Sequence, residues 1–595
     1  MKRISVFVLA AVMMFGGMVT NAPEAKASGV DVKMRGLFEF AFNNMHNRNF
    51  GDSANWGRQR VAGAGADQTG ANSQEARKKN DNFEARQRLR IWANFVASEN
   101  LSGTLSFRIG QTVWGRGAGG GGAVANGNAG GALDADGVNI RVKHVFIDWL
   151  VPNTSVSVRM GIQPMALPSI RFGSNVLQAD MGGITVSSPI TDWLRVTAFW
   201  VRPLDSHANT FNANAGFNQA DTIGGRNNRW GGLSNNVNTT ADFFGLVLPM
   251  NFTGVRVSPW AMYGRIGAAS GMFQPGAGYA FTRTVAPLDF ATPLVVANST
   301  SVGTGTANAW YLGANLNVTI LDPLVFGMDM VYGRIGRTDY GGLTTGQAIH
   351  DWRDRHNGGP FRGMEASGWY IGATLDYRMS WGTPGIFGWY GSGDSLGGRE
   401  QGKIGRMPSI MTDSNTFRYS SFGGSGMFGL SQEAFANVTG TGTGNWGVGI
   451  QVANVSFVKD LTHVLRFAYV RGTNDAGIPQ AVLHDAQFAY GQGGGVNDGR
   501  SILPFNQRSL LMWGADALYL TTKDSVFEIN FDHQYRIYEN LTAALELGYL
   551  RLSSDVNTWG SNHAQWARNG HQDGRRHTKG SSNAWKANLM FNYSF

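Results

Sequence analysis

The carboxyl-terminal stretch, residues 584–595, alternates between two kinds of side chain and ends on a phenylalanine. One face would carry Trp585, Ala587, Leu589, Phe591, Tyr593 and Phe595, and the other Ala584, Lys586, Asn588, Met590, Asn592 and Ser594. Successive side chains of a β-strand point to opposite sides, so this stretch predicts a strand with one apolar face. Many similar stretches precede it, with very few helical patterns to cover them. We therefore predict that the apolar faces meet lipid.

Lipid offers the backbone no hydrogen-bond partners, so a sheet that spans a membrane must close on itself. The final strand would close such a ring against the first strand, and Trp585, Phe591, Tyr593 and Phe595 are its expected barrel-closing residues. The alternative interpretation is an ordinary amphipathic edge strand of a soluble sheet.

The amino terminus has the features of a secretory signal peptide over residues 1–27. The basic pair Lys2-Arg3 precedes an apolar stretch over 6–19, and small residues follow at a cleavage site that ends with Ala27. The apolar stretch is too short for a permanent transmembrane helix. We therefore expect the chain to be exported and to cross a membrane with strands.

The composition fits a large barrel. The 595-residue chain has no cysteine, but a closed hydrogen-bond ladder needs no disulfides for its stability. Its 82 glycines suit turns and loops, while an aromatic content of 12% excludes a disordered glycine-rich chain and suits aromatic girdles at the membrane interfaces. The formal net charge of +9 is modest for this length, so the placement of charges matters more than their sum.

Short connections built on Asp, Asn, Gly or Pro recur between alternating strands, as tight hairpin turns do. They lie at 99–101, 152–154, 191–193, 251–254, 322–324, 382–385, 459–461 and 539–541. Longer connections rich in Gly, Asn, Ser and Thr alternate with them. This order predicts an all-β fold, a transmembrane antiparallel β-barrel of 16–18 strands with short periplasmic turns and long extracellular loops, in one domain over 28–595. Eighteen is the expected count, with sixteen the alternative, because the strands near 181–190 and 386–391 are weakly marked.

Two local features complicate the pattern. In Ile140–Leu150 the alternation places Asp148 on the apolar side, which a β-bulge or a position below the membrane band would explain. The pentapeptide Tyr263-Gly264-Arg265-Ile266-Gly267 recurs over 332–336, either as a hairpin repeat or because two strands meet the same local needs.

A barrel of this size leaves an aqueous lumen, and inward side chains decide what passes. Basic residues concentrate on the inward faces of the first five strands, and the pore-lining candidates are Lys33, Arg35, Arg86, Arg88, Arg90, Arg108 and Arg159. Arg86, Arg88 and Arg90 share one face of one strand and form a column. We interpret these residues as a cationic wall that attracts anions. The alternative is lumen solvation, with charges paired locally to Glu39 or Glu84.

The stretch 164–183 is the candidate constriction loop. Its start, Pro164-Met165-Ala166-Leu167-Pro168, is too apolar for a surface loop, and it is the third long connection by spacing. If it folds into the barrel, Asp180 would face the basic wall and create a transverse field. The alternative is a loop that packs against a neighbouring subunit.

Motifs for metal binding and catalysis are weak. Asp134 and Asp136 begin an Asp-x-Asp-Gly sequence typical of calcium loops, but the later Glu is missing, so an EF-hand is excluded and only a structural calcium in the extracellular loops remains possible. No lipase-type serine elbow, zinc-protease motif or P-loop occurs, and no cysteine nucleophile is available. We therefore expect no enzyme activity and no cofactor.

Three motifs carry a family resemblance: Val32-Lys33-Met34-Arg35-Gly36, Gly161-Ile162-Gln163-Pro164 and Tyr593-Ser594-Phe595. With the signal peptide and the order of strands, they make the sequence similar to the outer-membrane homotrimeric porins of sulfate-reducing bacteria, over essentially the whole mature chain. The resemblance implies a trimer of independent pores in the bacterial outer membrane, surrounded by lipid and lipopolysaccharide. The ending also resembles the closing strands that the barrel assembly machinery recognises.

The expected function is a porin with a water-filled pore for passive diffusion of small hydrophilic solutes and a mild preference for anions. One alternative is a substrate-specific anion channel for sulfate, phosphate or organic acids. A second is a structural surface-layer barrel with loop-bound calcium, and a third, disfavoured for lack of motifs, is an outer-membrane hydrolase.

Overall fold

The computed structural model describes residues 29–46, 82–115, 140–169, 173–205, 240–267, 306–338, 364–400, 403–412, 419–420, 443–477, 520–553, 555, 558 and 581–595. The expected signal peptide over 1–27 and the expected calcium ligands Asp134 and Asp136 lie outside these ranges. They remain predictions from the sequence.

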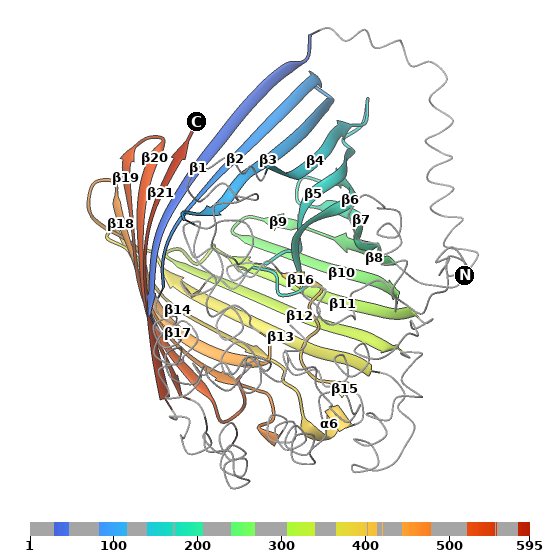
Figure 1. The fold of residues 1–595 in the computed structure, drawn as a ribbon. Helices are drawn as coiled ribbons and strands as arrows, with labels where there is room; N and C mark the ends of the chain where they lie inside the picture. The colour runs from blue at the N-terminus through green and yellow to red at the C-terminus, as the bar shows by residue number, and fades with distance from the viewer. Residues whose placement is uncertain are drawn as a thin grey trace, which may run out of the picture.

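The described residues form a single closed wall of antiparallel strands (Figure 1). Its strands are β1 (Asp31–His46), β2 (Asn82–Ser98), β3 (Leu101–Val113), β4 (Ile140–Leu150), β5 (Ser157–Ala166), β6 (Leu177–Pro189), β7 (Arg195–Asp205), β8 (Thr240–Val247), β9 (Met250–Phe252), β10 (Val255–Gly267), β11 (Thr306–Val318), β12 (Leu324–Thr338), β13 (Met364–Tyr377), β14 (Thr383–Gly391), β17 (Asn445–Val458), β18 (Leu461–Gly472), β19 (Ser525–Tyr538), β20 (Leu541–Ser553) and β21 (Ser581–Ser594). Three short elements, α6 (Leu396–Glu400), β15 (Lys403–Ile404) and β16 (Met411–Thr412), belong to the connection after β14.

The wall has eighteen strands in the described part of the chain. The sheet contains 21 strand elements, but β8 and β9 both pair with β10 and form one interrupted strand, while β15 and β16 lie outside the wall. The expected even count is therefore confirmed at its upper value. Both weakly marked stretches form strands, β6 and β14, and each of the eight short connections lies at a turn between strands, although 251–252 belong to β9 and 383–385 to β14.

The first and last strands close the barrel. Strand β1 pairs with β21 from Leu37↔Ser594 to His46↔Trp585, and Figure 1 shows the two strands, blue and red, side by side. The terminal residue continues the ladder, because the Phe595 N–H donates to the Gly36 carbonyl at 3.1 Å and the Phe595 carbonyl accepts from the Gly36 N–H at 2.8 Å. The backbone seam is thus hydrogen-bonded to the last residue of the chain, as a sheet in lipid requires.

The outward faces form an apolar belt of membrane thickness. Trp310 on β11 and Ile320 just after it are 56% and 61% exposed. The roughly ten residues between them span about 34 Å along the strand, or about 26 Å at a tilt of about 40°. Aromatic side chains border the belt, with ring pairs such as Tyr263–Trp310 at 4.6 Å towards the loop end and Trp193–Phe252 at 5.4 Å at the turn end. These are the features of a transmembrane barrel of the bacterial outer membrane.

The helix α6 is five residues long. No described helix is long and apolar enough to cross a membrane.

Strand β4 contains the bulge that its sequence suggested. Its register with β3 shifts between Ser106↔His144 and Phe107↔Val142, so Lys143 is the extra residue. Beyond the bulge His144 and Phe146 are buried on the inner face, whereas Val145 is exposed to the membrane. The shift therefore explains why Asp148 can point inward in an otherwise alternating strand.

A charge placed at mid-height on the outer face should destabilise the barrel. Ala314 on β11 follows the outward Leu312 by two residues and lies near the middle of the apolar belt. We expect Ala314→Arg to lower the free energy of unfolding by about 2–4 kcal/mol, because the guanidinium would lie in hydrocarbon. Equilibrium unfolding in urea after folding into lipid bilayers measures this.

The matched control is Thr306→Arg on the same outer face of β11, at the loop end beyond Trp310 and opposite Gly267. It should cost about 0–1 kcal/mol. Equal costs for the two substitutions would contradict this placement of the membrane.

Candidate functional site

The arginine column on β2 lies on the inner face, but carboxylates balance most of its charge. Arg88 donates from Nε and Nη2 to Glu39 at 2.6 and 2.8 Å, and Arg90 donates from Nη2 to the same carboxylate at 2.8 Å. Arg86 pairs with Glu84 at 2.6 Å. The arginines remain between 10% and 26% exposed, whereas Glu39 and Glu84 are buried. Three cations thus face two carboxylates, an excess of one.

A second row of arginines crosses the strands at one height. In register, Arg90 on β2 stands opposite Arg108 on β3, and Arg108 stands opposite Arg141 on β4. Within the described residues no carboxylate forms an ion pair with Arg108 or Arg141. Among these arginines of the described residues, Arg108 and Arg141 therefore carry more uncompensated positive charge than the column on β2.

The remaining basic candidates lie elsewhere. Lys33 is near the free start of β1, 3.9 Å from Asp31, and both side chains are mostly exposed. The Arg35 guanidinium lies 5.1 Å from the ring centroid of Trp92 at the turn end of the barrel. Arg159 donates two bonds to Asp148, at 2.7 and 3.1 Å. These three residues line the turn-side mouth and the lower wall rather than the arginine row.

The expected constriction loop is a β-hairpin instead of an irregular loop. Residues 164–166 belong to β5 and 177–183 to β6, so the connection covers only 167–176. The hairpin end leaves the wall, because β5 pairs with β4 only as far as Ile162, and β6 pairs with β7 only from Gly182. The two arms pair with each other, and β6 adds a short parallel pairing with β16. Backbone pairing along these arms is the reason that the sequence-based loop boundaries were wrong.

Asp180 lies on this hairpin end and contacts the basic wall. Its carboxylate is 3.0 Å from Lys143 Nζ and 2.9 Å from His144 Nε2. Both partners come from the bulge of β4, and the side chain of Asp180 remains about one-third exposed. The carboxylate and the arginine row therefore lie on the same side of the lumen.

The opposite side of the lumen is packed with apolar side chains. Strands β8 to β14 point large residues inward, and all are buried: Phe243, Trp260, Met262, Tyr311, Ile335, Tyr370, Phe387 and Trp389. Leu167, Val176 and Leu177 of the hairpin belong to the same cluster, as do Met407 and Ile410 of the connection after β14. The lumen is therefore divided into a packed apolar half and a half that borders the basic wall.

Small residues on the wall accommodate the inward rings. A Cβ on Gly313 would lie 2.3 Å from the Trp260 ring, and one on Gly447 would lie 2.3 Å from the Trp389 ring. Each ring therefore lies across the backbone of the next strand, where a side chain would displace it.

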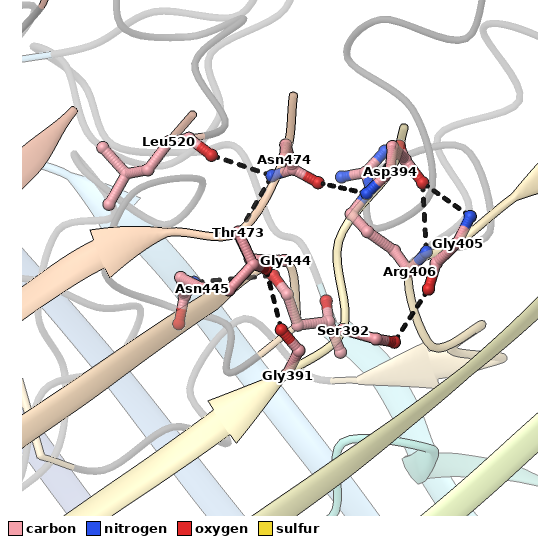
Figure 2. Close-up of polar contacts among 11 residues, drawn as sticks. Gly391, Ser392, Asp394, Gly405, Arg406, Gly444, Asn445, Thr473, Asn474 and Leu520 are labelled. Carbon is pink, nitrogen blue, oxygen red and sulfur yellow. Dashed lines mark hydrogen bonds and ion pairs between the residues drawn. The ribbon is translucent and has the colours of Figure 1, made fainter. Parts of the chain in front are cut away.

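A buried group of polar residues, the polar node, holds the connection after β14 in place on the apolar side of the lumen (Figure 2). The Asp394 carboxylate accepts the backbone N–H groups of Gly405 and Arg406 at 2.9 and 3.0 Å, and the Arg406 Nε at 3.0 Å. Asn474 accepts the Asp394 N–H at 3.0 Å and donates to the carbonyls of Gly444 and Leu520 at 2.9 and 2.8 Å. The node thus ties the connection after β14 to the segments that border β17, β18 and β19.

A second polar wall lies across from the packed connection. Arg466 on β18 pairs with Asp532 on β19, and Lys586 on β21 lies 3.4 Å from Glu546 on β20, all of them buried. Tyr419 packs against Trp389 at 4.7 Å on the apolar side. Burial and the charge of Glu528 raise the pKa of the Tyr419 phenol well above its usual value, so the hydroxyl stays protonated.

Sequence reasoning missed several of these groups. His144 was not a candidate because the bulge reverses its face, although the misplaced Asp148 signalled the shift. Asp394, Arg406 and Asn474 lie in glycine-rich connections without a strand pattern. Within the described residues no group of three or more His, Cys, Asp or Glu side chains could hold a metal ion.

The sequence matches no family model and no curated protein. Among solved structures, OccK8 (OprE) of Pseudomonas aeruginosa aligns at 9% identity over 95% of this chain and 98% of that one, with a TM-score of 0.42. The outer membrane protein OpdK of the same species aligns at 10% identity over 95% and 98%, with a TM-score of 0.44. OccAB3 of Acinetobacter baumannii aligns at 10% identity over 95% and 100%, with a TM-score of 0.42. Similarity at this level assigns no function to the chain.

Removing one partner of the node should loosen the connection in the lumen. We expect Arg406→Ala to cost about 3–5 kcal/mol, because it takes the guanidinium from the buried Asp394 carboxylate. The single-channel conductance in planar bilayers should rise and become noisier as residues 403–410 leave the packed half.

The double variant Asp394→Asn with Arg406→Gln removes both charges and should disturb the conductance less than Arg406→Ala does. If Arg406→Ala had the same conductance and thermal stability as the parent, the node would not hold the connection.

Proposed function

We propose that the protein is a porin, a passive water-filled pore for small hydrophilic solutes with a mild preference for anions. The observation that carries this proposal is the arginine row at Arg108 and Arg141 on the inner face of a closed transmembrane barrel, with no paired carboxylate among the described residues. Selectivity would follow from the width of the passage beside this wall and from its charge, without a cofactor or energy coupling.

Coulomb's law sets the size of the expected preference. A unit charge about 7 Å from a permeating ion in water-like surroundings contributes about 0.6 kcal/mol, which corresponds to about a threefold change in local ion concentration. Two such arginines would favour anions over cations, and screening by salt reduces this to a mild preference. The column on β2 contributes less, because Glu39 and Glu84 neutralise two of its three charges.

A substrate-specific anion channel for sulfate, phosphate or organic acids is the second candidate. The contact of Asp180 with Lys143 and His144 favours it, because opposite charges beside one passage would orient a dipolar solute. Flux that saturates with the concentration of one solute would support this candidate over a diffusion pore.

The resemblance to the homotrimeric porins of sulfate-reducing bacteria leads us to propose a trimer of independent pores. Insertion events in three equal conductance steps, together with a trimeric mass in detergent, would support this assembly. Single steps from a monomeric species would exclude it.

The arginine row should set the reversal potential under a potassium chloride gradient. We expect Arg108→Gln combined with Arg141→Gln to lower the chloride-to-potassium permeability ratio by about sevenfold for each charge, because the loss of a charge lowers the local anion concentration and raises the local cation concentration by about threefold each. Planar-bilayer recordings of the purified full chain measure the ratio.

The control is a variant that should change the permeability ratio in the opposite direction. Glu39→Gln removes the carboxylate that balances Arg88 and Arg90, so it should raise the same ratio. A reversal potential near zero that neither variant moves would leave the arginines as lumen solvation and contradict the proposed preference.

A further inference from the structure

Five strands carry the same tripeptide pattern, an aromatic residue and then an arginine two positions later. The pairs are Trp200 and Arg202, Tyr263 and Arg265, Tyr332 and Arg334, Tyr469 and Arg471, and Tyr549 and Arg551. They lie on β7, β10, β12, β18 and β20, each of which follows a short turn. The recurring pentapeptide at 263–267 and 332–336 is one part of this longer series.

The arginines face outward at the loop end of the barrel. All five side chains are exposed, whereas the residues between or after them, such as Val201, Ile335 and Leu550, are buried on the inner side. Each arginine is the next outward-facing residue after its aromatic, about 7 Å further along the strand towards the loop end. The five therefore form a rim just outside the aromatic girdle, which we call the outer arginine rim.

Two pairs of this rim have the same geometry. Arg265 stands opposite Asn308 on β11, and Arg334 stands opposite Trp310, two residues towards the turn end. Arg471 stands opposite Ser525 on β19, and Arg551 stands opposite Phe527, again two residues on. In both cases two arginines flank a middle strand, so their backbones are about 10 Å apart across the sheet. The barrel therefore presents the same two-arginine unit twice.

Carboxylates compensate only part of the rim. Asp242 accepts from Arg202 at 2.8 and 3.2 Å and stands opposite Arg265 in register. Arg471 Nε donates to the Thr522 carbonyl at 2.8 Å. In the described ranges no carboxylate pairs with Arg334 or Arg551. Each two-arginine unit thus has one member whose charge is open to a ligand in the membrane interface.

A guanidinium recognises phosphate through parallel hydrogen bonds, and an aromatic ring beside it suits the boundary between acyl chains and head groups. We propose that the outer arginine rim binds the phosphates of a phosphorylated glycolipid of the outer leaflet, lipopolysaccharide. The two-arginine units Arg265–Arg334 and Arg471–Arg551 are its main sites. The bound lipid would hold the barrel at a fixed depth, with each tyrosine against the acyl region and each arginine at the phosphate level.

The test uses the purified full chain in detergent, titrated with diphosphorylated lipid A while tryptophan fluorescence follows thermal unfolding. We expect a rise in the unfolding midpoint that saturates with lipid concentration, since a ligand of the folded state stabilises it. The variant Arg334→Gln with Arg551→Gln should bind at least about tenfold more weakly, because each loses a charge-assisted bond to phosphate. The control Arg378→Gln with Arg536→Gln removes two exposed arginines at the opposite, turn end and should bind like the parent.

Two further probes separate the lipid from its parts. Dephosphorylated lipid A should give less than half of the midpoint shift, and inorganic phosphate alone should give none. Equal shifts with and without the lipid phosphates, or unchanged binding by the Arg334 and Arg551 variant, would overturn the proposal. A full shift with inorganic phosphate would replace it with a site for free anions.

Discussion

The backbone hydrogen bonds of this chain must all be made within the sheet, because hydrocarbon offers none. The seam between β1 and β21 meets this requirement up to the last residue, where Phe595 exchanges bonds with Gly36. Closure in turn fixes which face of every strand meets lipid and which meets the lumen. The inward and outward assignments of the arginines, the bulge in β4 and the position of the girdle all depend on that seam.

The inner face of the barrel wall is apolar on one side and charged on the other. The inner faces of β8 to β14 are as apolar as a protein core, and they are covered by the hairpin end of β5 and β6 and by the connection after β14. The inner faces of β1 to β4 are charged and remain partly exposed. The proposed pore would therefore have its passage beside Arg108, Arg141 and Asp180, with the apolar filling on the other side.

The fold was largely predictable because its signals are local. Alternation, turn residues and the terminal Phe595 depend on neighbours in sequence, and they gave the strand number, the turns and the closing pair. The inward rings were not predictable, because strands such as β10 and β11 have apolar residues on both faces and no alternation distinguishes Trp260 from the membrane side. Glycine on the neighbouring strand is a usable signal, since Gly313 and Gly447 lie beneath Trp260 and Trp389. The Asp394 node depends on contacts between connections far apart in the chain, which no local pattern encodes.

The wall of the packed half comes from one block of chain, to which the hairpin end of β5 and β6 is added, whereas the charged half comes from the two ends. Strands β8 to β14, with the connection that covers them, contact their sequence neighbours, and such contacts need only short loops to be closed. The strands that must meet last, β1 and β21, carry Glu39, Lys586 and Asn588 on their inner faces. All three are almost completely buried, so the closing seam has a polar inner face that is covered rather than open to water.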